Sequence, residues 1–320
     1  MSLGNPNFLE KFMNLDECVL RALYLFEKAG LPDLDLGDYK RPLVVGSGNA
    51  AVTGRILLEG TDAVFSDEST YEKKLDACSD IDGAILISAS GEKHAPIIAS
   101  ELKRRGLETR LLTCNPDASA IPIVGEANSF VFPRQCEPYT YNTSTYLGMI
   151  LAKTKEDPAL IRQFIKEGIE KKVPDNLAEY SGFYFLLPEK FDDLREMFLT
   201  KFDELFAPMV FGRAFTMEQS KHAKTVIKPD SEHRELIVSL GYSDEDWLSE
   251  KGKVPLQYNA EVLNLPPQLD ASYGSAMAIG YYFIGKIPSQ KPPYFRDCIQ
   301  DFCERSSRSS GKVVRPIVSS

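Results

Sequence analysis

Several features that would place a chain in a familiar class are missing from these 320 residues. No run of about 18 uncharged apolar residues occurs, which argues against a membrane-spanning helix. The N-terminus also lacks the basic start and apolar stretch of a secretory signal. The six cysteines form no Cys-x-x-Cys pair and suit a reducing compartment better than a disulfide framework. We therefore expect a cytoplasmic protein that does not bind membranes.

Signatures of metal and nucleic-acid binding are absent as well. The chain has three histidines without a His-x-His or His-Glu-x-x-His pattern, so we expect no metal site. Its formal net charge of −9 opposes binding to a polyanion, and its basic residues form no long stripe interleaved with aromatics. We therefore expect no nucleic-acid partner, although a small anion held locally is compatible with this charge.

Hydrophobic residues make up 43% of the chain, which is enough for two cores. Residues 8–30 alternate apolar and charged positions at helical spacing and end at Gly30, which predicts an amphipathic N-terminal helix. Five short apolar strands follow, mostly separated by helical stretches, at residues 42–46, 62–66, 84–88, 109–113 and 129–133. This alternation is typical of an α/β fold in which helices cover both faces of a parallel sheet.

The second half of the chain is less regular. A helical stretch at 144–173 is interrupted at Pro158. Beyond it the sequence predicts three strands and then an apolar helix, at residues 207–212, 235–241, 260–266 and 271–287. We therefore divide the chain into an N-terminal helix, a first α/β unit, a linking helix and a second unit with a C-terminal tail, at residues 1–39, 40–155, 156–179 and 180–320.

A polar turn follows the third predicted strand and leads into a helix. It contains Ser88, Ser90, Gly91 and Lys93. Backbone N–H groups at a helix N-terminus lack partners and attract anions, and two hydroxyls with a lysine would complete such a site. The turn therefore predicts phosphate binding. The alternative interpretation is that the serines only cap the helix.

A second glycine-containing turn follows the first predicted strand. Gly46, Gly48 and Ala51 match the Gly-x-Gly-x-x-Ala fingerprint of dinucleotide-binding proteins, and Asp67 and Glu68 lie about 20 residues on, where a ribose-binding carboxylate is expected. An NAD(P)-dependent oxidoreductase is therefore one hypothesis. The more elaborate turn after the third strand favours instead the strand order 2-1-3-4-5, in which strands one and three flank the ligand. On that interpretation we expect no cofactor.

The two turns together resemble those of the sugar isomerase (SIS) domain. Ser88, Ser90 and Gly91 match its Ser-x-Ser-Gly-x-Thr phosphate loop. Residues 137–152 are similar to the Glu-x5-Thr stretch that closes the first unit of double-SIS proteins, and residues 133–135 are similar to the Pro-Arg of phosphoglucose/phosphomannose isomerases. The resemblance implies two doubly wound parallel-sheet units with a flavodoxin-like strand order, the second shortened.

The resemblance also implies a set of site residues. The expected phosphate ligands are Ser47, Gly48, Asn49, Ser88, Ala89, Ser90, Gly91 and Lys93. Arg134 and Glu137 are expected to contact the substrate. The chain departs from the family pattern at Ala50, where a serine is usual, and at Lys93, where a threonine is usual. Each departure loses a hydroxyl ligand, whereas Lys93 adds a charged donor.

Aldose–ketose isomerisation needs a carboxylate base, a ring-opening group and positive charge near the developing oxyanion. Residues 230–236 resemble the family's ring-opening histidine segment, and residues 307–314 resemble its C-terminal Arg-x3-Lys. Residues 212–226 resemble the turn and helix that carry the family's catalytic glutamate, but its position reads Lys221 or Thr225. The resulting catalytic candidates are His233, Lys312, Glu218, Glu232 and Glu235.

Three functional hypotheses follow from these residues. The first is a phosphosugar isomerase for a hexose or amino-sugar phosphate, or a related deglycase. Because the family glutamate is not matched, the alternative is a sugar-phosphate-binding regulatory protein without catalysis, and the NAD(P)-dependent oxidoreductase is third. SIS sites often borrow residues across subunits, so the resemblance also implies a homodimer. The expected partner is a small sugar phosphate.

Overall fold

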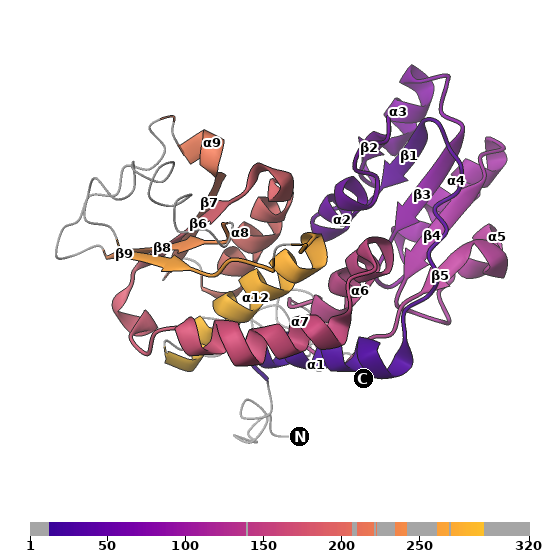
Figure 1. Ribbon diagram of the computed structural model, residues 1–320. Coiled ribbons are helices and arrows are strands. Elements are labelled where there is room, and N and C mark those ends of the chain that lie inside the picture. The colour runs from indigo at the N-terminus through magenta and orange to yellow at the C-terminus, as the bar shows by residue number, and fades with distance from the viewer. Residues whose placement is uncertain are drawn as a thin grey trace, which may run out of the picture. The chain divides into compact units, whose positions relative to one another are not determined.

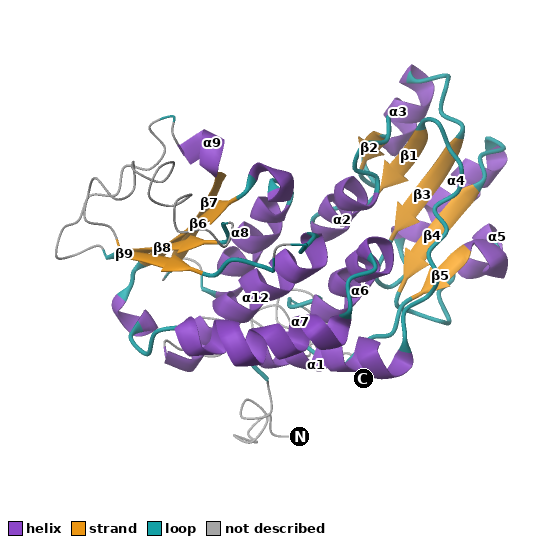
Figure 2. Ribbon diagram, viewed as in Figure 1, coloured by secondary structure: helices purple, strands orange, loops and turns teal. Residues whose placement is uncertain are grey.

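The computed structural model describes residues 13–138, 140–206, 210–220, 222, 234–241, 261–268 and 270–290. The chain folds as two compact units (Figure 1). The first unit comprises Ala22–Gln135 and Ser144–Ala159, and the second comprises Met1–Arg21, Cys136–Thr143 and Leu160–Ser320. Each unit is built around its own parallel sheet (Figure 2).

The sheet of the first unit has five strands in the order β2-β1-β3-β4-β5, and every neighbouring pair is parallel. The strands are β1 Pro42–Val45, β2 Val64–Ser66, β3 Gly83–Ile87, β4 Thr109–Thr113 and β5 Ser129–Val131. The connecting helices are α2 Asn49–Leu57, α3 Tyr71–Ala77, α4 His94–Arg104 and α5 Ile121–Val124. This order confirms the expected 2-1-3-4-5 arrangement.

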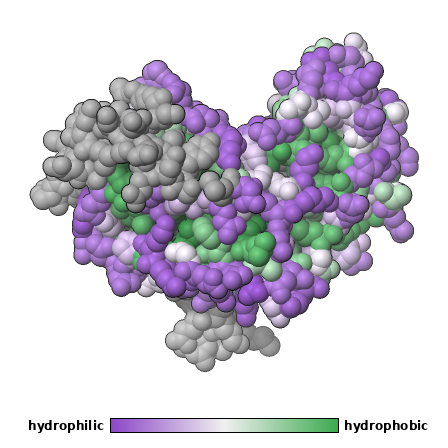
Figure 3. All heavy atoms as spheres, in the orientation of Figure 1, coloured by the Kyte–Doolittle hydropathy of each residue, from purple (hydrophilic) through white to green (hydrophobic). Residues whose placement is uncertain are grey.

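The core of the first unit explains why its strands are almost continuously apolar. Leu43, Leu86 and Leu111 of the sheet are buried in one cluster with Ile98 and Leu102 of α4. Because a parallel sheet has helices on both faces, both sets of alternating strand residues must be apolar. On the side drawn in Figure 3, hydrophilic residues cover most of the outer surface of the helices and hydrophobic residues show between them.

One helix precedes the strands of the first sheet in the sequence and two follow them. Helix α1 spans Leu15–Ala29, within the predicted N-terminal helix. The helical stretch expected at 144–173 contains α6 Thr143–Thr154 and α7 Pro158–Phe164. The break falls at Pro158 as expected, because proline fits the first position of a helix but not its interior.

The described part of the second unit contains a four-stranded parallel sheet in the order β7-β6-β8-β9. Its strands are β6 Gly182–Leu187, β7 Phe211–Thr216, β8 Glu235–Ser239 and β9 Glu261–Asn264. Numbered in chain order within this sheet, the strands lie in the order 2-1-3-4. This is the order of the first sheet without its fifth strand. The described helices of this half are α8 Leu194–Leu205, α9 Met217–Ser220 and α12 Tyr273–Gln290. The fold is therefore α/β with two doubly wound parallel sheets, the second smaller.

The structure differs from the sequence-based expectations at the start of the second sheet. Strand β6 and helix α8 were not expected, because a six-residue apolar run such as "GFYFLL" does not by its periodicity distinguish a strand from a buried helix. The strand expected at 207–212 is instead β7, beginning at Phe211. The stretch interpreted as a turn and helix from Gly212 therefore continues this strand before α9 begins.

Aromatic packing explains the position of the apolar helix α12. Phe183 and Phe185 of β6 contact Phe202 of α8 and Phe283 of α12, with ring centroids 5.7–5.9 Å apart. Most of α12 is buried within its own unit, so its apolar character serves that core. None of the helices in the described part of the chain combines the length and hydropathy that crossing a membrane requires.

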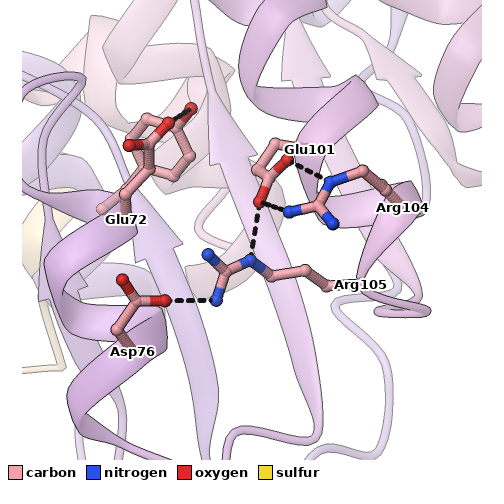
Figure 4. Close-up of polar contacts among 6 residues, drawn as sticks. Glu72, Asp76, Glu101, Arg104 and Arg105 are labelled. Atoms are coloured by element: carbon pink, nitrogen blue, oxygen red, sulfur yellow. Dashed lines mark hydrogen bonds and ion pairs between the residues drawn. The ribbon is translucent and has the colours of Figure 1, made fainter.

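A polar network joins α3 and α4 on the surface of the first unit (Figure 4). Glu101 accepts hydrogen bonds from Arg104 Nε and Nη2 at 2.7 and 2.6 Å and from Arg105 Nε at 2.7 Å. Arg105 also donates to Asp76 of α3 at 2.7 Å. The hydrogen bonds from the two guanidinium groups lower the pKa of Glu101 to about 2.

Glu101→Gln is expected to flatten the acid dependence of stability. A carboxylate whose pKa is depressed by folding stabilises the native state above its ordinary pKa, about 4.3, and loses this contribution as the pH falls through its folded value. The melting temperature of the parent should therefore fall more steeply between pH 5 and about 2 than that of the variant. The exposed Glu126, replaced by glutamine, is the control and should behave like the parent. Equal slopes for Glu101→Gln and the parent would show that the network contributes nothing to the acid dependence of stability.

Candidate functional site

The carboxyl ends of β1 and β3 form the candidate ligand site. These adjacent strands lead into α2 and α4, and in open parallel sheets ligands bind where neighbouring connections diverge in this way. All eight expected phosphate ligands lie in these two connections or at the start of their helices: Ser47, Gly48, Asn49, Ser88, Ala89, Ser90, Gly91 and Lys93.

Both helices begin without a side-chain cap. The residue before α2 is Gly48, with φ of 55°, and the residue before α4 is Lys93, with φ of 56°, and neither helix has a side-chain capping hydrogen bond. The N–H groups of Ala50 and Ala51 donate to Ser47 O and Gly48 O at 3.1 and 3.0 Å, and that of Ala95 donates to Glu92 O at 3.2 Å. The two helix starts therefore offer an anion mainly the positive ends of their dipoles, beside the polar side chains of the turns. Two such helix starts follow adjacent strand ends, which suits a phosphate ester.

The serines of the loop after β3 hold its shape. Ser88 Oγ accepts a hydrogen bond from Gly91 N at 3.1 Å, and Ser90 Oγ accepts one from Glu92 N at 3.3 Å. Both hydroxyls act here as acceptors, so each keeps its own proton for donation to a ligand. Gly91 has φ of 62°, and a Cβ there would clash with Ala118, so the loop requires glycine at this position.

Hydrogen bonds from the loop after β4 position the loop after β3. Asn115 Nδ2 donates to Ser90 O at 3.0 Å. Ser119 donates from its backbone N and its Oγ to the Glu92 carboxylate, at 2.9 and 2.6 Å. These bonds lower the pKa of Glu92. The carboxylate beside the anion site is therefore engaged in positioning a neighbouring loop.

Lys93 occupies a backbone conformation that lysine rarely adopts. Its positive φ puts a side-chain-bearing residue in a region where glycine is normally found, at a cost on the order of 1–3 kcal/mol. The side chain is exposed at the start of α4. Strained positions of this kind cluster at functional sites, and at this one the candidate site carries a cation.

The dinucleotide alternative finds less support. Asp67, one of the two candidate ribose ligands, accepts hydrogen bonds on Oδ1 from Ser69 N, Ser69 Oγ and Thr70 Oγ1 at 2.7–2.9 Å. These bonds lower its pKa to about 2 and organise the start of α3. The strand order also differs from the order 3-2-1-4-5-6 of dinucleotide-binding folds.

The remaining described candidates are distributed over both units. Arg134 is exposed beyond the carboxyl end of β5 in the first unit, whereas Glu137 is buried in the second. Glu218 is exposed on α9, with its carboxylate 3.9 Å from His222 Nε2. Glu235 begins β8 and lies 3.6 Å from Arg213, at the amino end of the second sheet. His233, Lys312 and Glu232 lie outside the described residues.

The second unit contains a buried polar cluster that the sequence did not indicate. Lys201 of α8 is fully buried, with Nζ 2.6 Å from Glu204 Oε2 and 5.5 Å from the ring centroid of Tyr281. Its ammonium also donates to Thr140 O and feels the charge of Glu137. The sequence signal for this burial was a lysine at helical spacing among apolar residues of α8. A lysine in such a pattern usually buries only its hydrocarbon stem and keeps its charged end in water.

Burial shifts both members of the Lys201–Glu204 pair toward their neutral forms. Desolvation lowers the pKa of Lys201 and raises the pKa of Glu204, and their mutual attraction opposes both shifts. Lys201 is fully buried, whereas the Glu204 side chain is 30% exposed. The ammonium of Lys201 therefore depends on Glu204 and on Thr140 O to compensate the burial of its charge.

No protein-family profile matches the chain, and no curated protein matches its sequence. Solved structures do match. The C-terminal domain of glucosamine-fructose-6-phosphate aminotransferase from Francisella tularensis is 15% identical, over 89% of this chain and 98% of that one, with a TM-score of 0.61. Tagatose-6-phosphate ketose/aldose isomerase from Escherichia coli is 15% identical, over 86% and 90%, with a TM-score of 0.59.

A third match is glucose-6-phosphate isomerase from Chlamydia trachomatis, 9% identical over 93% of this chain and 73% of that one, with a TM-score of 0.50. At these identities the matches establish the fold alone. The chain has the fold of the SIS-type phosphosugar isomerases, as the two turns led us to expect.

Proposed function

We propose that this protein is a phosphosugar isomerase acting on a hexose or amino-sugar phosphate. The observation that carries the proposal is the pair of uncapped helix starts after β1 and β3, furnished with Ser88, Ser90 and Lys93. The fold adds support, because the similar solved structures include a tagatose-6-phosphate ketose/aldose isomerase and a glucose-6-phosphate isomerase.

Arg134 is at a suitable distance to contact the end of the sugar that is remote from the phosphate. It follows β5, which is separated from β3 by β4 alone, so the two strand ends lie roughly 10 Å apart. That separation is comparable with the length of an extended hexose phosphate. In our proposal, its guanidinium stabilises the oxyanion of the enediolate formed when a proton leaves carbon 1 or 2.

A carboxylate must carry the proton between the two carbons. The candidates for this role stay Glu218, Glu232 and Glu235. His233 stays the candidate for ring opening and Lys312 the candidate for stabilising the enediolate. A regulatory protein that binds without isomerising is the second candidate, because the family's glutamate position reads Lys221 or Thr225. A cytoplasmic location remains our expectation.

Sugar phosphates are expected to raise the melting temperature of the protein, whereas free sugars and NAD are not. A ligand at 100 times its dissociation constant stabilises the folded state by about 2.7 kcal/mol, which corresponds to several degrees. Thermal-shift measurements would compare fructose, glucose, mannose and glucosamine 6-phosphates with their unphosphorylated sugars, NAD and inorganic sulfate. A rise with NAD and none with any sugar phosphate would instead support the oxidoreductase.

A further inference from the structure

The loop after β3 has three consecutive carbonyl oxygens bonded to the loop after β4. The bonds run to Ala89 O from Cys114 N at 3.0 Å, to Ser90 O from Asn115 Nδ2 at 3.0 Å and to Gly91 O from Ala120 N at 3.3 Å. A carbonyl oxygen carries a partial negative charge and repels an anion, whereas successive N–H groups form anion-binding concavities. The loop after β4 therefore engages the groups that would oppose phosphate binding.

Several N–H groups of the loop after β3 are in the opposite situation. Within the residues that the structure describes, the N–H groups of Ala89, Ser90 and Lys93 donate no hydrogen bond. In a planar trans peptide the N–H points opposite to the preceding carbonyl oxygen. Ser90 N–H therefore points away from the loop after β4, which binds Ala89 O. The loop thus has open donors next to Lys93, while the carbonyls of residues 89–91 are bonded elsewhere.

The Glu92 side chain adds a charged contact between the two loops. Its carboxylate accepts hydrogen bonds from Ser119 N and Ser119 Oγ, at 2.9 and 2.6 Å, and it adjoins Lys93 in the chain. By charge alone, a carboxylate at this position opposes a bound anion. The hydrogen bonds from Ser119 lower its pKa and so keep it ionised. The contacts of Glu92, rather than its charge, therefore suit an anion site.

We propose that Glu92 and Ser119 are positioning residues for phosphate binding by the loop after β3. Their two hydrogen bonds fix the loop before the ligand arrives, with its carbonyls on the loop after β4 and its free N–H groups available. A site that is ordered in advance loses less free energy on binding. The inference rests on the proposed function only for the phosphoryl group, and it is independent of which sugar is bound and of whether that sugar is isomerised.

Glu92→Ala separates positioning from charge, because the two effects change affinity in opposite directions. Loss of both hydrogen bonds from Ser119 is expected to raise the dissociation constants of inorganic phosphate and fructose 6-phosphate about tenfold. Loss of a negative charge alone would instead tighten binding of both anions. Isothermal titration calorimetry on the full chain measures the constants. Asp117→Ala is the matched control, because it removes a carboxylate from an exposed position of the loop after β4 and leaves the Glu92–Ser119 bonds intact. It should bind phosphate no more weakly than the parent.

Two substitutions of Ser119 test the partner side of the same contact. Ser119→Ala removes the hydroxyl donor and keeps the N–H, so it should weaken phosphate binding less than Glu92→Ala does. Ser119→Thr keeps both donors and should restore the affinity of the parent. Circular dichroism would verify that each variant is folded.

The outcomes distinguish this inference from the proposed function. A Glu92→Ala protein that binds phosphate as tightly as the parent, or more tightly, would overturn the positioning role even where the parent binds sugar phosphates. A Ser119→Thr protein as weak as Ser119→Ala would also overturn it. Binding of inorganic phosphate that Glu92→Ala weakens, without binding of any sugar phosphate, would support the positioning role and contradict the proposed isomerase. A parent that binds neither anion would overturn both.

Discussion

Lys93→Gly is expected to raise the melting temperature of the free protein and to weaken its binding of a sugar phosphate. Glycine adopts the φ of 56° without a steric penalty, which relieves strain on the order of 1–3 kcal/mol. The greater freedom of glycine in the unfolded chain offsets roughly 0.4–1 kcal/mol of that gain. Loss of the ammonium removes a charged hydrogen bond worth about 1.5–3 kcal/mol to a bound phosphate, or roughly 10- to 150-fold in affinity.

Lys155→Gly is the matched control for this prediction. Lys155 also has a positive φ, of 59°, and an exposed side chain, but it follows α6, away from the phosphate loop in the sequence. Its surface ion pair with Asp33 contributes little. This variant should gain stability as Lys93→Gly does and bind sugar phosphate like the parent. An unchanged dissociation constant in Lys93→Gly would show that Lys93 is not a phosphate ligand.

Glu204→Gln is expected to lower the free energy of unfolding of the free protein by about 3 kcal/mol, because it leaves the ammonium of the fully buried Lys201 without its carboxylate partner. Lys201→Met removes the buried charge itself and is expected to cost less. Urea denaturation of both variants and the parent would measure the two changes. Equal losses for the two variants would show that Glu204 does not compensate the charge of Lys201.

Proton exchange into the sugar tests the proposed isomerase itself. Incubation in deuterated water with each hexose 6-phosphate, followed by NMR, would report exchange at carbon 1 or 2. A general base contributes about 10²- to 10⁴-fold, so exchange is expected to fall a hundredfold or more in one of Glu218→Gln, Glu232→Gln and Glu235→Gln. Tight binding without exchange for any sugar phosphate would favour the regulatory protein.

The sequence by itself determined the architecture of the first unit and the location of its candidate anion site. Its strands are short apolar runs separated by helical stretches, and Ser88, Ser90 and Gly91 sit directly after one of them. These signals are local, because a strand buried on both faces must be apolar throughout and a helix start carries the positive end of the helix dipole. The strand order followed from them through the rule that ligands bind between diverging connections.

Only the tertiary structure decided which charged groups are buried and which backbone positions are strained. Lys201 reads in the sequence like any lysine of an amphipathic helix, and its burial beside Glu204 depends on α12 and on Thr140, both distant in the chain. Lys93 reads in the sequence as an ordinary loop cation, and its positive φ is seen only in the structure. Desolvation and strain arise from the atoms that surround a residue, and a linear pattern does not contain those neighbours.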